Sequence, residues 1–374
     1  MNSTRVSLIL FALVLALGIA AYAGPRSGLL VLIGLGFGLT MEGLGLGFSG
    51  PWRLLVTERD GRGCMAQLVA IGLTALLAIP LLAVGASELI GAHAPVGIGM
   101  VLGAFVFGLC MQLVLGCGSG TLLNAGSGNL VSAVALVTFM LGSFFGTLNL
   151  GWWARLGSLP VLTLQGLFGT VGGLLLTLLL LLGVGLLVWQ RAVPGKRRPS
   201  DRLLIAAGLV AGFAILNLLI AGQPWGIVYG LGLWGAKLFQ VLGLDVAATA
   251  FWSAPANAER LAQSVLLDVT SLTNIGLVIG AFIVLRWRAA VAPQVAALQP
   301  VSWLVVAAAG LVLGYSSRIA FGCNVGGFFS GISTGSLHGW AWLLAGFAGS
   351  TIGIRLRERV LVPLRPPVAA AEAA

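Results

Sequence analysis

Residues 166–188 read "GLFGTVGGLLLTLLLLLGVGLLV", a run of 23 residues without one charged side chain. This run exceeds the ~20 apolar residues that a helix needs to cross the hydrocarbon core of a bilayer. The whole chain of 374 residues is 59% hydrophobic and only 8% charged, whereas soluble domains carry about 25% charged residues. Its apolar runs are continuous rather than alternating, which argues against a membrane β-barrel. The sequence therefore predicts an all-α polytopic membrane protein.

Apolar length and chain breakers together predict the individual membrane segments. We expect nine transmembrane helices near residues 5–23, 64–90, 96–114, 130–150, 168–190, 203–222, 262–285, 300–316 and 338–355. Four further apolar stretches are interrupted by glycine, and we expect re-entrant helical loops at 28–50, 116–128, 225–243 and 320–334. Such broken backbone is tolerated at membrane depth where it is buried in protein or lines a cavity.

The basic residues indicate orientation. The net charge is +10, but Lys and Arg gather at helix ends and linkers, so we read them as topology determinants and expect no nucleic-acid partner. With the N-terminus outside, nine crossings place 15 of the 20 Lys and Arg residues in the cytoplasm. The first apolar stretch also resembles a secretory signal with a cleavage site. Its removal would expose the arginines of the first loop, so we favour a retained helix.

A polar linker divides the chain into two halves that resemble each other. We expect a first membrane half at 1–190, a basic cytoplasmic linker at 191–202, a second membrane half at 203–357 and a cytoplasmic tail at 358–374. Three pairs of segments match in the same order, namely 33–41 with 229–237, 108–120 with 314–326, and 141–146 with 348–353. The alternative is chance alignment in a chain with 56 glycines. We predict an inverted repeat, a plan that places a transporter's substrate site near the midplane.

Each half carries one cysteine in a glycine-rich turn. The first turn reads "LVLGCGSGTLLNAGSGN" (113–129) and the second reads "RIAFGCNVGGFFSGIST" (318–334). Glycines let the backbone approach closely, and a helix that starts after such a turn presents free N–H groups to an anion. A thiol is a weak donor and a soft, polarizable group. We predict a pathway for a soft anion lined by Cys117, Cys323, Gly116, Gly118, Gly322 and Asn324.

Three further residues are candidates for the same pathway. Cys110 lies two helical turns before Cys117 on the same face, where a second thiol and a small packed residue are equally good readings. Lys237 and Arg318 are cations inside apolar segments, where charge is costly and usually functional. The cysteines show no Cys-x-x-Cys pair and no histidine cluster, so we expect neither a metal nor another cofactor.

The segments "FGLCMQLVLGCGSGTLLNAGSGN" (107–129) and "FGCNVGGFFSGISTGSLHGWAWLLAGFAGSTIG" (321–353) resemble the two signature regions of the YeeE/YedE family. The resemblance implies a bacterial inner-membrane transporter, and no enzyme, that takes up thiosulfate or a related sulfur anion. It further implies an hourglass-like architecture whose re-entrant loops meet at a narrow waist. There the loop cysteines, here Cys117 and Cys323, would relay the anion by S–H···S contacts.

The chain departs from the family pattern at one position. The family commonly carries a third cysteine before an arginine in the first re-entrant segment, whereas this chain reads "GLGFSGPWR" (45–53), with Gly47 or Ser49 near that place. The departure leaves room for a selenium compound as substrate. From other functional classes, the alternatives are a membrane thiol oxidoreductase and an anchor for a cytoplasmic sulfur-carrier or sulfurtransferase protein.

Overall fold

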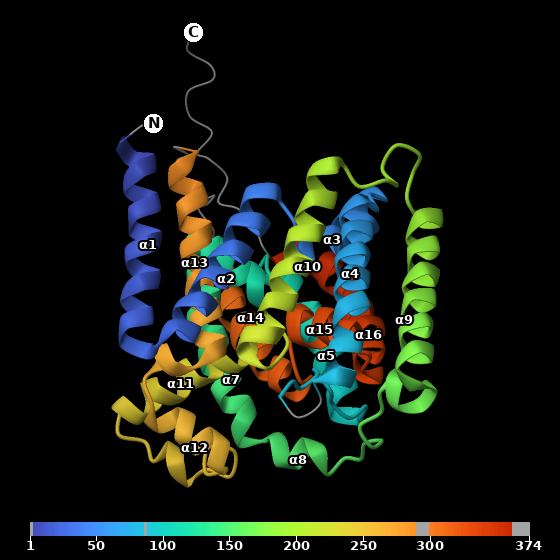
Figure 1. The fold of residues 1–374 in the computed structure, drawn as a ribbon. Helices are drawn as coiled ribbons and strands as arrows, with labels where there is room; N and C mark the ends of the chain where they lie inside the picture. Colours follow the sequence, from blue (N-terminus) through green and yellow to red (C-terminus); the bar gives the residue numbers. More distant parts are fainter. Residues whose placement is uncertain (1–2, 86–87, 289–298, 361–374) are drawn as a thin grey trace.

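The protein is a bundle of long helices with short helices between them (Figure 1). The computed structural model describes residues 3–85, 88–288 and 299–360, so most of the expected tail at 358–374 lies outside the described residues. The helices are α1 (Ser3–Ala23), α2 (Pro25–Leu44), α3 (Ser49–Glu58), α4 (Arg62–Val84), α5 (Ile98–Leu113), α6 (Gly118–Gly126), α7 (Leu130–Leu148), α8 (Leu150–Ala154), α9 (Leu164–Arg191), α10 (Asp201–Ala221), α11 (Val228–Val241), α12 (Pro255–Ala262), α13 (Val269–Trp287), α14 (Pro300–Ile319), α15 (Ser330–Ser333) and α16 (Leu337–Val360). Short turns of helix complete the chain at η1 (Val246–Ala248), η2 (Val265–Leu267) and η3 (Asn324–Phe329).

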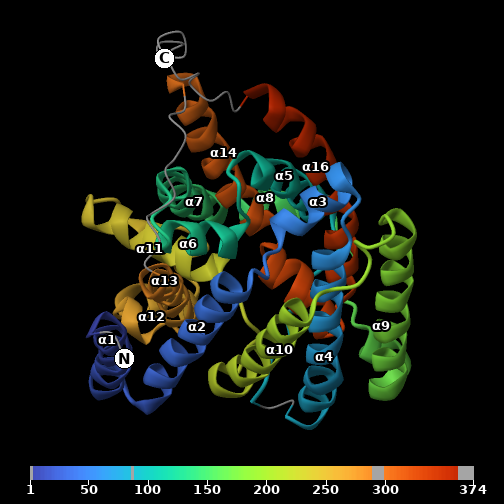
Figure 2. The same ribbon diagram turned by 90° about the horizontal axis from the view of Figure 1, so that it is seen from above.

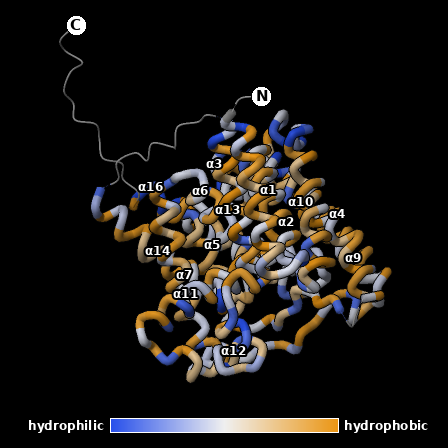
Figure 3. The backbone as a smooth tube through the Cα atoms, turned by 60° about the vertical axis from the view of Figure 1, so that its left-hand side comes forward, coloured by the Kyte–Doolittle hydropathy of each residue, from blue (hydrophilic) through white to orange (hydrophobic). Residues whose placement is uncertain are grey.

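The predicted class of an all-α polytopic membrane protein is confirmed. Within the described ranges, nine helical segments are long and apolar enough to cross a membrane. They are Thr4–Ala23, Pro25–Glu58, Arg62–Val84, Ile98–Gly126, Leu130–Leu148, Leu164–Arg191, Asp201–Ala221, Val269–Trp287 and Pro300–Ser333. These nine segments are not the same nine that the sequence predicted: α2 is among them, and the less apolar α16 is not. Figure 3 shows apolar residues along the long helices and hydrophilic residues at helix ends and around α12.

The expectation of a re-entrant loop at 28–50 is wrong for most of that stretch. Helix α2 runs without interruption for 20 residues. Its glycines are packing positions rather than breakers, because a Cβ at Gly34 would lie 2.4 Å from the Thr273 carbonyl oxygen and one at Gly38 would lie 2.3 Å from that of Leu277. Small residues let membrane helices approach this closely. The glycines therefore seat α2 directly on α13.

The packing of α2 on α10 contradicts the expected placement of the N-terminus and the 191–202 linker on opposite sides of the membrane. Arg26 at the start of α2 donates to the Ile220 carbonyl at the end of α10, whereas Arg202 at the start of α10 donates to the Gly43 carbonyl at the end of α2. The two helices are therefore antiparallel, and Arg26 lies at the end of the bundle opposite the 191–202 linker. Figure 1 shows the N-terminus at the same end as that linker. The charge count that placed the N-terminus outside treated α2 as non-crossing.

The long helices pack in pairs, several of them through close glycine contacts. Helix α2 packs on α13 and α4 on α10, while α7 packs on α14 and α5 on α16 (Figure 2). A Cβ at Gly142 of α7 would lie 1.9 Å from the Leu311 carbonyl oxygen, and one at Gly108 of α5 would lie 1.9 Å from that of Gly346. The short helices α6 and α15 lie among these pairs, against α13 and α4 respectively.

Candidate substrate pathway at the two cysteine turns

The two cysteine turns share the backbone conformation of the cysteines and of the residues two positions before them. Each follows the end of a long helix, α5 in the first half and α14 in the second. Two residues before each cysteine, Leu115 (φ 64°) and Phe321 (φ 55°) adopt the left-handed region, which is rare for bulky side chains. Cys117 (φ −80°, ψ −170°) and Cys323 (φ −89°, ψ −166°) are then extended and act as N-caps of α6 and η3. The two turns, which the sequence predicted to be alike, therefore also resemble each other in these backbone angles.

The hydrogen bonds of the two turns also correspond. In each turn the glycine before the cysteine donates to the carbonyl oxygen five residues earlier, at 3.1 Å in the first and 2.9 Å in the second. The carbonyl of each cysteine accepts from the amide four residues later, at 2.8 Å and 2.7 Å. The first amides of a helix have no carbonyl partner within the helix. Each cysteine therefore stands beside N–H groups at the start of a short helix.

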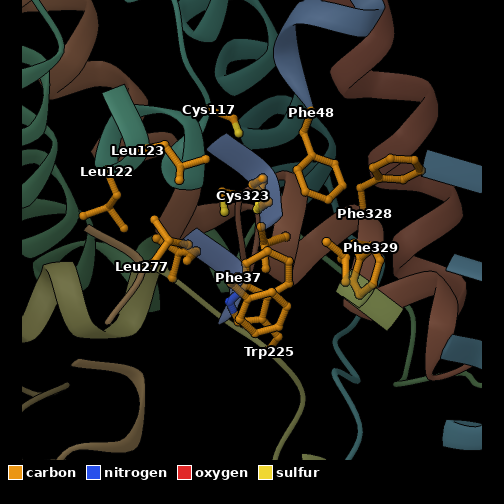
Figure 4. Close-up of a cluster of buried hydrophobic side chains, with 14 of the residues drawn as sticks. Phe37, Phe48, Cys117, Leu122, Leu123, Trp225, Leu277, Cys323, Phe328 and Phe329 are labelled. Carbon is orange, nitrogen blue, oxygen red and sulfur yellow. The ribbon is translucent and has the colours of Figure 1, made fainter. Parts of the chain in front are cut away.

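The two turns touch at Gly118, the residue after Cys117. A Cβ on Gly118 would lie 3.0 Å from the Cys323 sulfur, 3.2 Å from the Cys323 Cβ and 3.4 Å from Ile227. Both cysteines are fully buried free thiols, and the Cys117 sulfur lies 3.4 Å from the Ser119 hydroxyl (Figure 4). The structure thus brings together Cys117, Cys323, Gly116, Gly118 and Gly322, which the sequence predicted as pathway residues.

The N-terminal turn of α3 completes this region. A Cβ on Gly120 would lie 3.7 Å from the Cys117 sulfur and 4.0 Å from the Ser49 hydroxyl oxygen. Gln112 of α5 donates to the Ser49 carbonyl at 3.3 Å, which fixes the start of α3. Ser49, near the place of the family's third cysteine, therefore lies beside the Cys117 turn.

Aromatic rings border the cysteine turns on one side (Figure 4). Phe37 stacks on Trp225 with ring centroids 3.8 Å apart, and Phe48 and Phe329 meet edge to face at 5.9 Å. All four side chains are buried. These rings form an apolar wall beside the turns.

A cavity of about 370 Å³ reaches the second turn from the end of the bundle that carries α8 and α12 (Figure 1). Gly322 and Gly326, which flank Cys323, form part of its wall. Its polar lining among the described residues consists of His93, Gln223, Tyr229, Thr270, Ser317, Arg318 and His338. Sequence reasoning had selected Arg318 from this set. The other polar residues come from separate loops and helices, and no local pattern marks them.

Asn324 and Arg318 have side-chain donors without a protein partner. Asn324 is fully buried next to Cys323, and both its amide atoms lack a hydrogen-bond partner among the described residues. The buried Nε and Nη2 of Arg318 likewise have none. Buried polar groups in native proteins are nearly always hydrogen-bonded. Arg318 lines the cavity, so its unpaired donors indicate a place for a ligand or water there, whereas Asn324 does not line it.

Two sequence-predicted residues are not brought into this arrangement. Lys237 donates from its Nζ to the Leu261 carbonyl at 2.8 Å, ties α11 to α12, and does not line the cavity. Cys110 is buried within α5, two turns before Cys117, as part of the hydrophobic core. Its position fits a packed small residue.

Comparison with known proteins assigns the chain to a family. The sequence matches the family described as Sulphur transport over residues 45–352. The chain belongs to the sulphur transport family. The resemblance to YeeE/YedE proteins is thereby confirmed, and relatives in the family carry transporter names.

Three curated relatives match stretches of different length in this chain. It is 29% identical over 169 residues to the "Probable transporter YedE" of Escherichia coli K12, and 28% identical over 169 residues to that of Salmonella typhimurium LT2. These matches cover 44% of this chain and 39% of the length of either YedE protein. It is 24% identical over 335 residues to the "Thiosulfate transporter TsuA" of Spirochaeta thermophila, covering 83% of this chain and 92% of that protein.

Proposed function

We propose that this protein is a bacterial inner-membrane transporter for the uptake of thiosulfate or a related small sulfur anion. The anion would pass a narrow waist lined by Cys117 and Cys323. Family membership and the name of the relative TsuA support the substrate class. The observation that carries the proposal is the contact of Gly118 with the Cys323 sulfur, which joins the two turns in the interior of the bundle.

The waist would suit a soft anion for a chemical reason. A neutral thiol donates a weak hydrogen bond and is polarizable, so it contacts sulfur without binding it tightly. The N–H groups at the starts of α6 and η3 add favourable partial positive charge. A transported ion must bind well enough to enter and weakly enough to leave. Thiols beside short helix starts meet both conditions.

An inverted repeat would explain how the two turns come to face each other. Suppose that the helices of the two halves correspond in chain order, so that α2, α4, α5 and α7 match α10, α13, α14 and α16. Each pair of packed helices is then converted into another observed pair when the two halves are interchanged. The pair α2 with α13 then maps onto α10 with α4, and α7 with α14 maps onto α16 with α5. In this scheme α3 rather than α2 corresponds to α11, so the proposed match of 33–41 with 229–237 is replaced. The short helices α3, α6, α11 and η3–α15 would then be the re-entrant elements.

Uptake of radiolabelled thiosulfate tests the function directly. We expect the wild-type chain to restore growth on thiosulfate in a bacterial strain that lacks other importers for it. Cys117→Ala and Cys323→Ala should each abolish both growth and uptake. Cys64→Ala is the matched control, because Cys64 is also a buried free thiol but lies at the start of α4. Normal uptake by both Cys117→Ala and Cys323→Ala would disprove the thiol waist.

Ser49 stands near the place where the family commonly carries a third cysteine, and this difference is a reason to test a second substrate in the same assay. Ser49 places a hydroxyl, a harder donor than a thiol, beside the Cys117 turn. Competition of labelled thiosulfate uptake by selenite and by sulfate would show whether the pathway prefers sulfur or selenium anions. Stronger competition by selenite than by unlabelled thiosulfate would make a selenium compound the substrate. A cytoplasmic sulfur-carrier protein or sulfurtransferase remains a proposed partner, supported by the basic residues at the linker end.

A further inference from the structure

The cavity outside the Cys323 turn contains one cation whose charge the protein does not neutralise. Arg318 belongs to neither ion pair of the described residues, which join Arg62 to Asp60 and Lys196 to Glu58. The described lining of the cavity includes no aspartate and no glutamate. Burying an ionised group without a partner is costly, and arginine stays protonated at any physiological pH. An anion in the cavity would neutralise this charge.

Two aromatic rings hold the guanidinium without using its donors. The Arg318 Cζ lies 5.4 Å from the centroid of the Tyr229 ring and 4.9 Å from that of Phe251. Gly232 of α11 lies beside the group, since a Cβ there would be 3.6 Å from the Arg318 Cζ. Ring faces attract a cation but accept little from its N–H groups. The buried Nε and Nη2 thus stay available to a ligand.

The remaining polar lining consists of neutral groups that suit an oxyanion. The Gln223 side chain donates to the Thr270 hydroxyl at 3.3 Å, which leaves the hydroxyl proton of Thr270 free to point elsewhere. His93 contacts the Thr334 carbonyl, and His338 contacts the Ser336 hydroxyl. The acidic group near this region, Asp268, caps α13 through the Ser271 amide and does not line the cavity.

We propose that this cavity is an anion-binding site in which Arg318 binds a small dianionic oxyanion of the thiosulfate and sulfate class before the ion reaches Cys323. The proposal rests on the proposed transport function for the order of events but not for binding itself. Two donors of one guanidinium match two oxygens of a tetrahedral anion in a fork geometry. A lysine would supply the positive charge but not the two parallel N–H donors of a guanidinium. The Arg318 site would select anions by their charge and shape, and the thiols beyond it would select those with polarizable sulfur atoms.

Equilibrium binding to the purified full-length protein in detergent tests the site without requiring transport. Thiosulfate and sulfate would be titrated by calorimetry into the wild type, Arg318→Gln, Arg318→Lys and Cys323→Ala. Arg318→Gln should weaken binding at least about tenfold, since charge-assisted hydrogen bonds are among the strongest polar contacts. Arg318→Lys should retain part of the affinity. Cys323→Ala should weaken binding less than Arg318→Gln does, because its thiol is placed beyond the cavity.

The matched control is Arg260→Gln. Arg260 also lies over the Tyr229 ring, at 4.9 Å, but does not line the cavity. We expect it to leave binding within about twofold of the wild type, with the melting temperature of every variant showing that it is folded. Wild-type affinity in a folded Arg318→Gln would overturn the proposal, as would binding lost in Cys323→Ala but not in Arg318→Gln. Binding with no uptake would refute transport and keep the anion site.

Discussion

Replacing Gly118 with alanine should block the proposed waist at the point where the two cysteine turns touch. The new methyl group would lie 3.0 Å from the Cys323 sulfur and 3.2 Å from its Cβ, closer than ordinary van der Waals contact. Gly118 has a negative φ, so the backbone itself accepts a side chain. The effect would therefore come from the added volume between the turns.

The expected stability change is small compared with the expected loss of transport. Overpacking a close contact costs about 1–3 kcal/mol, while Gly→Ala in a helix returns about 0.5–1 kcal/mol. The protein should therefore fold, with a melting temperature lowered by a few degrees. A passage that narrows by a methyl group should raise the barrier by at least about 1.4 kcal/mol, which lowers the uptake rate tenfold.

Gly120→Ala is the matched control in the same helix. Its methyl group would lie 3.7 Å from the Cys117 sulfur and 4.0 Å from Ser49, which are ordinary contacts. Both variants would be compared by initial rates of thiosulfate uptake, normalised to the amount of protein in the membrane. We expect a loss of at least about tenfold for Gly118→Ala and less than about threefold for Gly120→Ala. Equal rates in the two variants would mean that the anion does not pass between Gly118 and Cys323.

Three further predictions concern proximity, packing and pH. Gly118→Cys should form an oxidant-induced cross-link with Cys323, since the two Cβ atoms would be 3.2 Å apart, and a reductant should reverse it; no mass change after oxidation would contradict the contact. Gly108→Ala should lower the melting temperature sharply because its Cβ would lie 1.9 Å from the Gly346 carbonyl oxygen, while Gly208→Ala, with nothing within 4 Å, should not. The hydrogen bond from Arg62 lowers the pKa of Asp60 in the loop before α4, so this stabilisation is present above the unfolded pKa of about 3.9 and is lost as the pH falls through the folded value. Asp60→Asn should therefore lower stability at pH 7 by about 1 kcal/mol or less. Its melting temperature should converge with that of the wild type only as the pH falls through the lowered pKa of Asp60; a constant gap across pH would exclude the ion pair as the cause.

Apolar length decided the membrane class correctly because it is a local property that no packing partner can change. A charge-free run such as 166–188 can be stable only in lipid or in a large core. Glycine was a poorer guide. In residues 28–44 it indicated a broken helix, whereas in the fold these glycines let α2 pack against α13. Glycine occurs both in turns and where two helices pack closely, so its structural role depends on which part of the fold packs against it.

At the cysteine turns, too, some features could be predicted from the sequence and others only from the tertiary structure. The sequence alone paired Cys117 with Cys323 through the glycines around them, and in the fold both cysteines have the same extended backbone. It also selected Arg318 as an unusual cation. Tertiary structure alone decided that Gly118 touches Cys323, that Tyr229 and Phe251 flank Arg318, and that Lys237 lies elsewhere. These contacts join residues far apart in the chain, and helix packing rather than any local pattern determines which of them meet.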